Sequence, residues 1–118
     1  MDGITIFHNP ACSTSRQVLE AIRATGADPT VVEYLTSPPD RATLLRLVAD
    51  MGVPLRAILR QKAEPYAALG LADPGKTDAQ LLDAIERHPV LIERPIVVTP
   101  LGTRLCRPAP LLADILPR

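Results

Sequence analysis

Aromatic residues, lysine and net charge are all scarce in this chain of 118 residues. It contains one Phe, two Tyr and no Trp, so its core must be built from aliphatic side chains. Thirteen basic residues balance thirteen acidic ones. This balance argues against a nucleic-acid partner, because binding phosphates requires a clustered excess of Lys and Arg. Eleven of the basic residues are Arg, whose planar guanidinium suits oxyanions better than an ammonium group does.

Long apolar runs are missing as well. No window approaches the roughly 20 apolar residues of a membrane span, and the first residues lack the basic segment and apolar core of a signal peptide. We therefore expect a cytoplasmic protein with no membrane partner, in which thiols stay reduced. Its two cysteines, Cys12 and Cys106, should then be free rather than bridged. Together with two histidines they fall short of a convincing zinc site.

The chain does contain an alternation of strands and helices, which predicts a single domain over residues 1–118. The predicted strands are 4–7, 29–35, 95–99 and 103–106, and the predicted helices are 13–26, 41–52, 78–88 and 110–116, with short irregular helices within 53–70. Ser13 or Thr14 is expected to cap the first helix, Asp40 the second, and Thr77 with Gln80 the next.

This order of elements predicts an α/β fold. A right-handed β-α-β unit followed by a hairpin and a helix makes a thioredoxin-like mixed sheet, here with a helical insertion between the β-α-β and β-β-α halves. A small flavodoxin-like sheet is the second possibility. It would need more strands that are each followed by a helix than the sequence offers.

The stretch HNPACSTSR, residues 8–16, places Cys12 between the first strand and the first helix. The positive end of a helix dipole lowers the pKa of a thiol there. His8 could add positive charge when protonated, and Ser13, Thr14 and Ser15 offer hydroxyl donors to the sulfur. The alternatives are a small buried thiol for Cys12 and an ordinary hydrogen-bonded histidine for His8. Position and polar neighbours favour a nucleophilic Cys12.

The partners of Cys12 must come from elsewhere in the chain. A phosphatase-type loop needs an arginine after five intervening residues, where this sequence has Val18, and a CxxC motif would need a cysteine at Ser15. A second thiol therefore comes either from Cys106 or from another molecule.

Three arginines, Arg60, Arg94 and Arg107, lie beside predicted breaks or strand ends. A proline that opens the third strand of a thioredoxin-like sheet is commonly cis and faces the first loop, which could bring Arg94 near Cys12. For each arginine taken alone, a solvated charge or a surface ion pair is the simpler interpretation.

The segments HNPACSTSR, ADMG, LLR, EPY and HPVLIERPIVVTPLGTRLCRP together closely resemble the glutaredoxin-linked arsenate reductases of the bacterial arsenic-resistance type. The resemblance runs from Ile4 to about Asp114, and RPIVVTPLGTRLCRP is its most specific part. It implies that Cys12 is the nucleophile, that His8 depresses the pKa of Cys12 and that the Ser15 hydroxyl helps to hold the thiolate. It also implies three arginines that bind the arsenate oxygens, namely Arg60, Arg94 and Arg107.

The activity implied by this resemblance is the reduction of arsenate to arsenite. Cys12 would attack arsenate, glutathione would act as co-substrate, and glutaredoxin would resolve the mixed disulfide, with no metal and no bound cofactor. An alternative is a thiol redox-sensing regulator of the same fold that binds RNA polymerase, although such regulators typically carry the CxxC that is absent here. Use of external glutathione favours a packing role for Cys106 over a resolving one.

Overall fold

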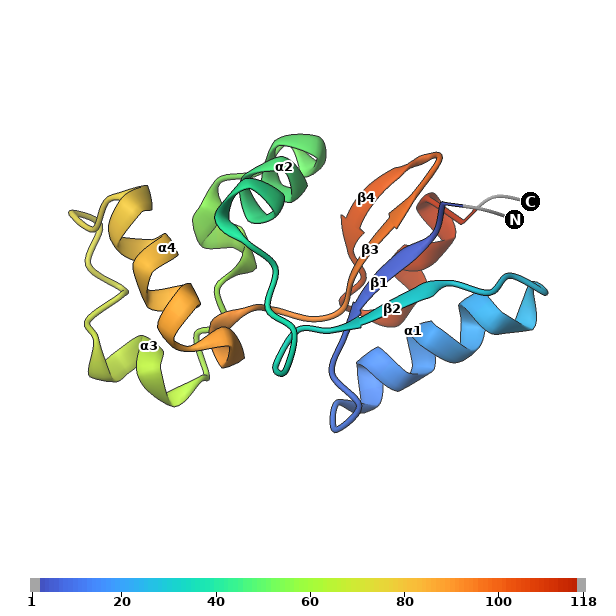
Figure 1. Cartoon of the computed structure of the whole chain (residues 1–118), viewed down its shortest axis with the longest axis horizontal. Helices are drawn as coiled ribbons and strands as arrows, with labels where there is room; N and C mark the ends of the chain where they lie inside the picture. The colour runs from blue at the N-terminus through green and yellow to red at the C-terminus, as the bar shows by residue number, and fades with distance from the viewer. Residues whose placement is uncertain (1–2, 117–118) are drawn as a thin grey trace. The chain divides into compact units, whose positions relative to one another are not determined.

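The computed structural model describes residues 3–116, which group into two compact units. The first unit comprises the described residues up to Ser37 together with those from Arg94 onward, and the second is Pro38–Glu93. Each unit is described by itself, and Figure 1 labels its elements. No helix within residues 3–116 is long and apolar enough to cross a membrane.

The first unit contains a four-stranded sheet with strand order β2-β1-β3-β4. Its strands are β1 (Thr5–His8), β2 (Thr30–Glu33), β3 (Ile96–Thr99) and β4 (Gly102–Leu105). β1 pairs in parallel with β2 through the crossover helix α1 (Ser13–Ala24), whereas β1–β3 and β3–β4 are antiparallel. The mixed sheet predicted from the sequence is confirmed.

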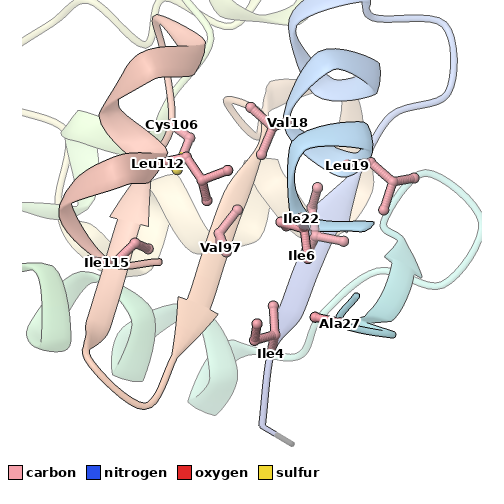
Figure 2. Close-up of a cluster of buried hydrophobic side chains, with 10 residues drawn as sticks. All are labelled: Ile4, Ile6, Val18, Leu19, Ile22, Ala27, Val97, Cys106, Leu112 and Ile115. Carbon is pink, nitrogen blue, oxygen red and sulfur yellow. The ribbon is translucent and has the colours of Figure 1, made fainter. Parts of the chain in front are cut away.

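One face of this sheet carries the core of the first unit. α1 and the 3-10 helix η3 (Ala109–Asp114) lie on the same face, as Figure 2 shows. Ile6 and Val97 are register partners on adjacent strands and point to this face. The buried cluster consists of Ile4, Ile6, Val18, Leu19, Ile22, Ala27, Val97, Cys106, Leu112 and Ile115. This packing holds the start of α1 beside the carboxyl end of β1.

Two local predictions for the first unit were wrong. Neither Ser13 nor Thr14 caps α1, because the helix begins one residue earlier than a serine cap requires and Cys12 itself is the N-cap residue. The last element is a 3-10 helix rather than an α-helix. Pro108 is its N-cap residue and Pro110 lies in its first turn, where a missing N–H costs no helical bond, and a helix this short often adopts 3-10 geometry.

The second unit is the predicted helical insertion. It contains α2 (Arg41–Met51), η1 (Leu55–Ile58), α3 (Glu64–Ala68), α4 (Asp78–Arg87) and η2 (Pro89–Leu91). The predicted caps are confirmed: Asp40 accepts from Thr43 N–H at 2.8 Å, and Thr77 and Gln80 form a capping box. Whether the two units together act as the single domain expected from the sequence stays a prediction.

Candidate active site

Cys12 lies at the end of the β1–α1 loop, where the first free N–H groups of α1 point. The backbone of Cys12 is extended, with φ −95° and ψ 122°, and the residue is 9% exposed. Its own N–H donates to Asn9 O at 3.0 Å, and its carbonyl accepts from Arg16 N–H at 3.0 Å. The thiol therefore sits at the positive end of the helix, as the sequence predicts.

The surroundings of Cys12 favour the thiolate. Burial by itself would raise the pKa of this thiol, but the Ser15 N–H, the Arg107 guanidinium and the charge of Arg94 outweigh it and lower the pKa below its ordinary value of 9.0. Arg107 Nη1 lies 3.7 Å from Cys12 Sγ. A larger share of Cys12 is thus ionised near neutral pH than for an ordinary cysteine.

The strand pairing explains why residues so distant in sequence meet here. Phe7 at the end of β1 pairs with Ile96 at the start of β3, and Ile96 pairs in turn with Leu105 at the end of β4. The end of the sheet that carries the Cys12 loop is therefore also reached by Arg94, two residues before β3, and by Arg107, two residues after β4.

The Arg107 side chain also contacts the backbone of Arg94 at this end of the sheet. Arg107 Nη1 donates to Arg94 O at 3.4 Å, and both arginines precede cis prolines, Pro95 and Pro108. Arg94 is 8% exposed, whereas Arg107 is exposed to solvent. The expected proximity of Arg94 to Cys12 is confirmed. An anion that reaches Cys12 would meet at least one accessible guanidinium.

Arg60 belongs to the second unit. Its backbone N–H donates to Leu91 O at 2.7 Å, just after the isolated bridge between Leu59 and Ile92. These bonds position its backbone within that unit. Its part in holding an oxyanion at Cys12 stays a prediction.

His8 and Ser15 form a buried pair behind the loop. His8 Nδ1 and Ser15 Oγ are 2.6 Å apart, and Ser15 Oγ also accepts from Asn9 N–H at 3.1 Å. Burial lowers the pKa of His8 below its ordinary value of 6.5, although Glu33 opposes the change. Burial thus favours the neutral ring, and the positive charge that His8 could add when protonated stays a prediction. The Ser15 hydroxyl serves His8 and Asn9, while the contact that lowers the pKa of Cys12 comes from the Ser15 backbone N–H.

Cys106 lies in the core of the first unit, where Figure 2 shows it beside Leu112. It is fully buried, and its thiol donates to Arg104 O at 3.7 Å. Burial raises the pKa of Cys106 to about 11. This environment supports the packing role rather than a resolving role. Both cysteines are free thiols.

Asn9 is a residue of the loop to which the sequence patterns assigned no role. In the structure its side chain is 8% exposed and bonded within the loop, where Oδ1 accepts from Ala11 N–H at 2.9 Å. The available signal was the Asn-Pro pair itself, because Asn side chains commonly bond the backbone two residues on. Among residues 3–116, no three His, Cys, Asp or Glu side chains are grouped so that they could hold a metal ion.

Comparison with known proteins gives consistent results. The model of the ArsC family matches residues 7–114. An arsenate reductase of Acidiphilium multivorum is 59% identical over 117 residues, which are 99% of this chain and 83% of that protein. An arsenate reductase of Escherichia coli strain K12 is 57% identical over 117 residues, again 99% of this chain and 83% of that protein. The solved structure of an arsenate reductase from Vibrio cholerae has a TM-score of 0.91 at 40% identity and covers 96% of this chain and 97% of that one.

These similarities confirm the predicted fold class, since the overlap with the Vibrio cholerae structure takes in nearly the whole of both chains. The family match spans the Cys12 loop as well as the segments that carry Arg60, Arg94 and Arg107.

Proposed function

This chain belongs to the ArsC family, and on that premise we propose that it reduces arsenate to arsenite at Cys12. The observation that carries the proposal is the pairing of Cys12 Sγ with Arg107 Nη1 at 3.7 Å, at a thiol whose pKa is lowered. Relatives 57 to 59% identical to this chain are named arsenate reductases, which supports arsenate as the oxyanion.

The chemistry requires two negative groups to approach each other. A thiolate must meet the arsenate oxyanion, and an arginine beside both offsets the repulsion and stabilises the charge that develops during attack. Arg107 is suited to this because it is exposed and already close to the sulfur. Arg94 is buried and adds its positive charge near the sulfur. Arg60 is proposed as the third arginine by its match to the family motif.

The first step forms a bond between Cys12 sulfur and arsenic, and arsenate loses one oxygen as water after proton transfer. Glutathione, the proposed co-substrate, then attacks the Cys12 sulfur. The electron pair of the sulfur–arsenic bond stays with arsenic, which leaves as arsenite in the trivalent state, while Cys12 is left in a disulfide with glutathione. Glutaredoxin would resolve this disulfide by thiol–disulfide exchange and return the free thiol. No metal or bound cofactor enters these steps.

His8 and Ser15 would assist through structure rather than charge. With its pKa lowered by burial, His8 holds the Ser15 side chain at 2.6 Å, and Ser15 in turn presents its backbone N–H to Cys12. Loss of either side chain is expected to disturb that N–H contact. Since the proposed reductants are cytosolic thiols, the proposal includes a cytoplasmic location.

A coupled assay tests the proposal. The purified protein is mixed with arsenate, glutathione, glutaredoxin, glutathione reductase and NADPH, and NADPH oxidation is followed. We expect turnover that depends on arsenate and that falls at least about a thousandfold in Cys12→Ser, because the nucleophile is lost. Cys106→Ala is the matched control and keeps its activity. Turnover without arsenate, or full activity in Cys12→Ser, would refute the proposal, and capture of RNA polymerase without turnover would favour the regulator.

A further inference from the structure

Asn9 makes four hydrogen bonds around the Cys12 loop, and its backbone and side chain both take part. Its carbonyl accepts from Cys12 N–H at 3.0 Å, and its N–H donates to Ser15 Oγ at 3.1 Å. Its side-chain Oδ1 accepts from Ala11 N–H at 2.9 Å, and its Nδ2 donates to Tyr34 OH at 3.4 Å. Asn9 therefore takes part in most of the hydrogen bonds that hold the loop.

The two hydrogen bonds of the Asn9 side chain hold different parts of the structure. The bond from Oδ1 to Ala11 N–H closes a turn of the kind that Asn and Asp favour, which shapes the backbone just ahead of Cys12. The bond from Nδ2 to Tyr34 ties that turn to the chain just after β2. Tyr34 is 1% exposed, so its hydroxyl is a rigid anchor rather than a mobile surface group.

We propose that Asn9 is a positioning residue for the Cys12 nucleophile, and that Tyr34 acts on Cys12 through Asn9. Cys12 is the N-cap residue of α1, and the Ser15 N–H of that helix faces its sulfur. How well the sulfur meets this N–H depends on the backbone at residues 9–12, which the turn held by Asn9 sets. Its effect on arsenate turnover rests on the proposed function, whereas its effect on the reactivity of the Cys12 thiol does not.

The expected consequence follows from the contacts of the sulfur. The Ser15 N–H and Arg107 act over short distances, with Arg107 Nη1 at 3.7 Å, so a small shift of the loop weakens both. The thiolate is then less stable and less well aimed, while the hydrophobic core behind α1 is untouched. A merely structural residue would lower the stability of the fold without changing the reactivity of the folded thiol.

The first test measures alkylation of Cys12 by iodoacetamide as a function of pH, with the unfolding midpoint measured in parallel. In Asn9→Ala we expect the rate at pH 7 to fall about tenfold and the pH profile to move to higher pH. The kcat for arsenate should fall by a similar factor, while KM changes less than about threefold, since the arginines stay in place. Asn9→Ser, whose hydroxyl forms the same turn more weakly, should recover part of the rate.

The second test is a double-mutant cycle. Tyr34→Phe removes the hydroxyl and keeps the ring, and we expect the alkylation rate to fall about threefold in the wild-type background but not further in Asn9→Ala. An additive effect would overturn the action through Asn9. Asp73→Ala is the matched control: it removes the equivalent side-chain bond to Gly75 N–H in the second unit, 2.8 Å long, and should leave alkylation of Cys12 unchanged.

The two proposals fail separately. If folded Asn9→Ala and Asn9→Ser alkylate at the wild-type rate, the positioning role is overturned whether or not arsenate is the substrate. If Asn9→Ala does not fold, the positioning role is also overturned when Asn9→Ser and Tyr34→Phe both alkylate at the wild-type rate. If alkylation slows as expected while even the wild-type protein does not reduce arsenate, the positioning role stands and the proposed function falls.

Discussion

Cys12 and Cys106 are two thiols of one compact unit, both withdrawn from solvent, with 9% and 0% of their surface exposed. Cys12 lies at the open end of α1, with the Ser15 N–H and two arginines around its sulfur. Cys106 lies among aliphatic side chains, and its thiol donates only to Arg104 O at 3.7 Å. The pKa of the first is lowered and that of the second is raised to about 11.

The difference shows that burial does not decide the reactivity of a cysteine by itself. Burial disfavours the thiolate at both positions, and the outcome depends on whether N–H donors and cations face the sulfur. The contrast extends to adjacent residues: Cys106 enters the core while Arg107 points to Cys12. Successive side chains of an extended chain point to opposite sides, so one segment serves both packing and the site.

The largest expected effect is a difference in alkylation rate between the two thiols. At pH 7 we expect iodoacetamide to modify Cys12 more than about a hundredfold faster than Cys106, because their folded pKa values differ by more than two units, from below 9.0 to about 11. Because the folded protein lowers the pKa of Cys12, the rise of its alkylation rate with pH should occur at lower pH in the folded protein than in protein unfolded in urea. Mass spectrometry of the two peptides measures both rates. Equal rates in the folded protein would remove the distinction between the two sites.

The next effect concerns two arginines that flank Cys106. Arg107→Ala is expected to lower kcat/KM for arsenate about a hundredfold and to raise the pKa of Cys12, since it removes a guanidinium that lies 3.7 Å from the sulfur. Arg107→Lys should keep part of the activity. Arg104→Ala is the matched control: Arg104 pairs with Asp114 at 3.4 Å near the surface, and its loss should change kcat/KM less than about twofold. Equal losses in the two alanine variants would contradict the assignment.

The smallest effect is on stability. Cys106→Ala should lower the free energy of unfolding by about 1 kcal/mol, because a well-packed core atom is removed. Cys106→Ser should lower the free energy of unfolding further, because a buried hydroxyl needs a close hydrogen-bond partner. The Arg104 carbonyl lies 3.7 Å from the Cys106 sulfur, which is too far for such a bond. Urea denaturation measures both changes. Activity per folded molecule should remain within about twofold, and a tenfold loss would instead indicate a resolving thiol.

Much of this molecule could be predicted from local patterns. The strand that precedes Cys12 and the apolar stripe of α1 with Val18, Leu19 and Ile22 follow from hydrophobic periodicity, and Asp40 and Thr77 mark helix starts by their own chemistry. These features depend on residues a few positions apart. Position at a helix start also sufficed to predict a reactive Cys12.

The remaining features depend on contacts between distant segments. Position beside a predicted strand end marked Arg94 and Arg107 as candidates, but only the antiparallel pairing of β1, β3 and β4 brings them to Cys12. Likewise only packing shows that His8 is buried, which lowers its pKa, and that Asn9 reaches Tyr34. The sequence by itself determined most of the helices and strands and the position of Cys12 at a helix start, because these depend on neighbouring residues. The tertiary structure decided which charges and hydrogen bonds surround that thiol, because those come from strands that meet only when the sheet has formed.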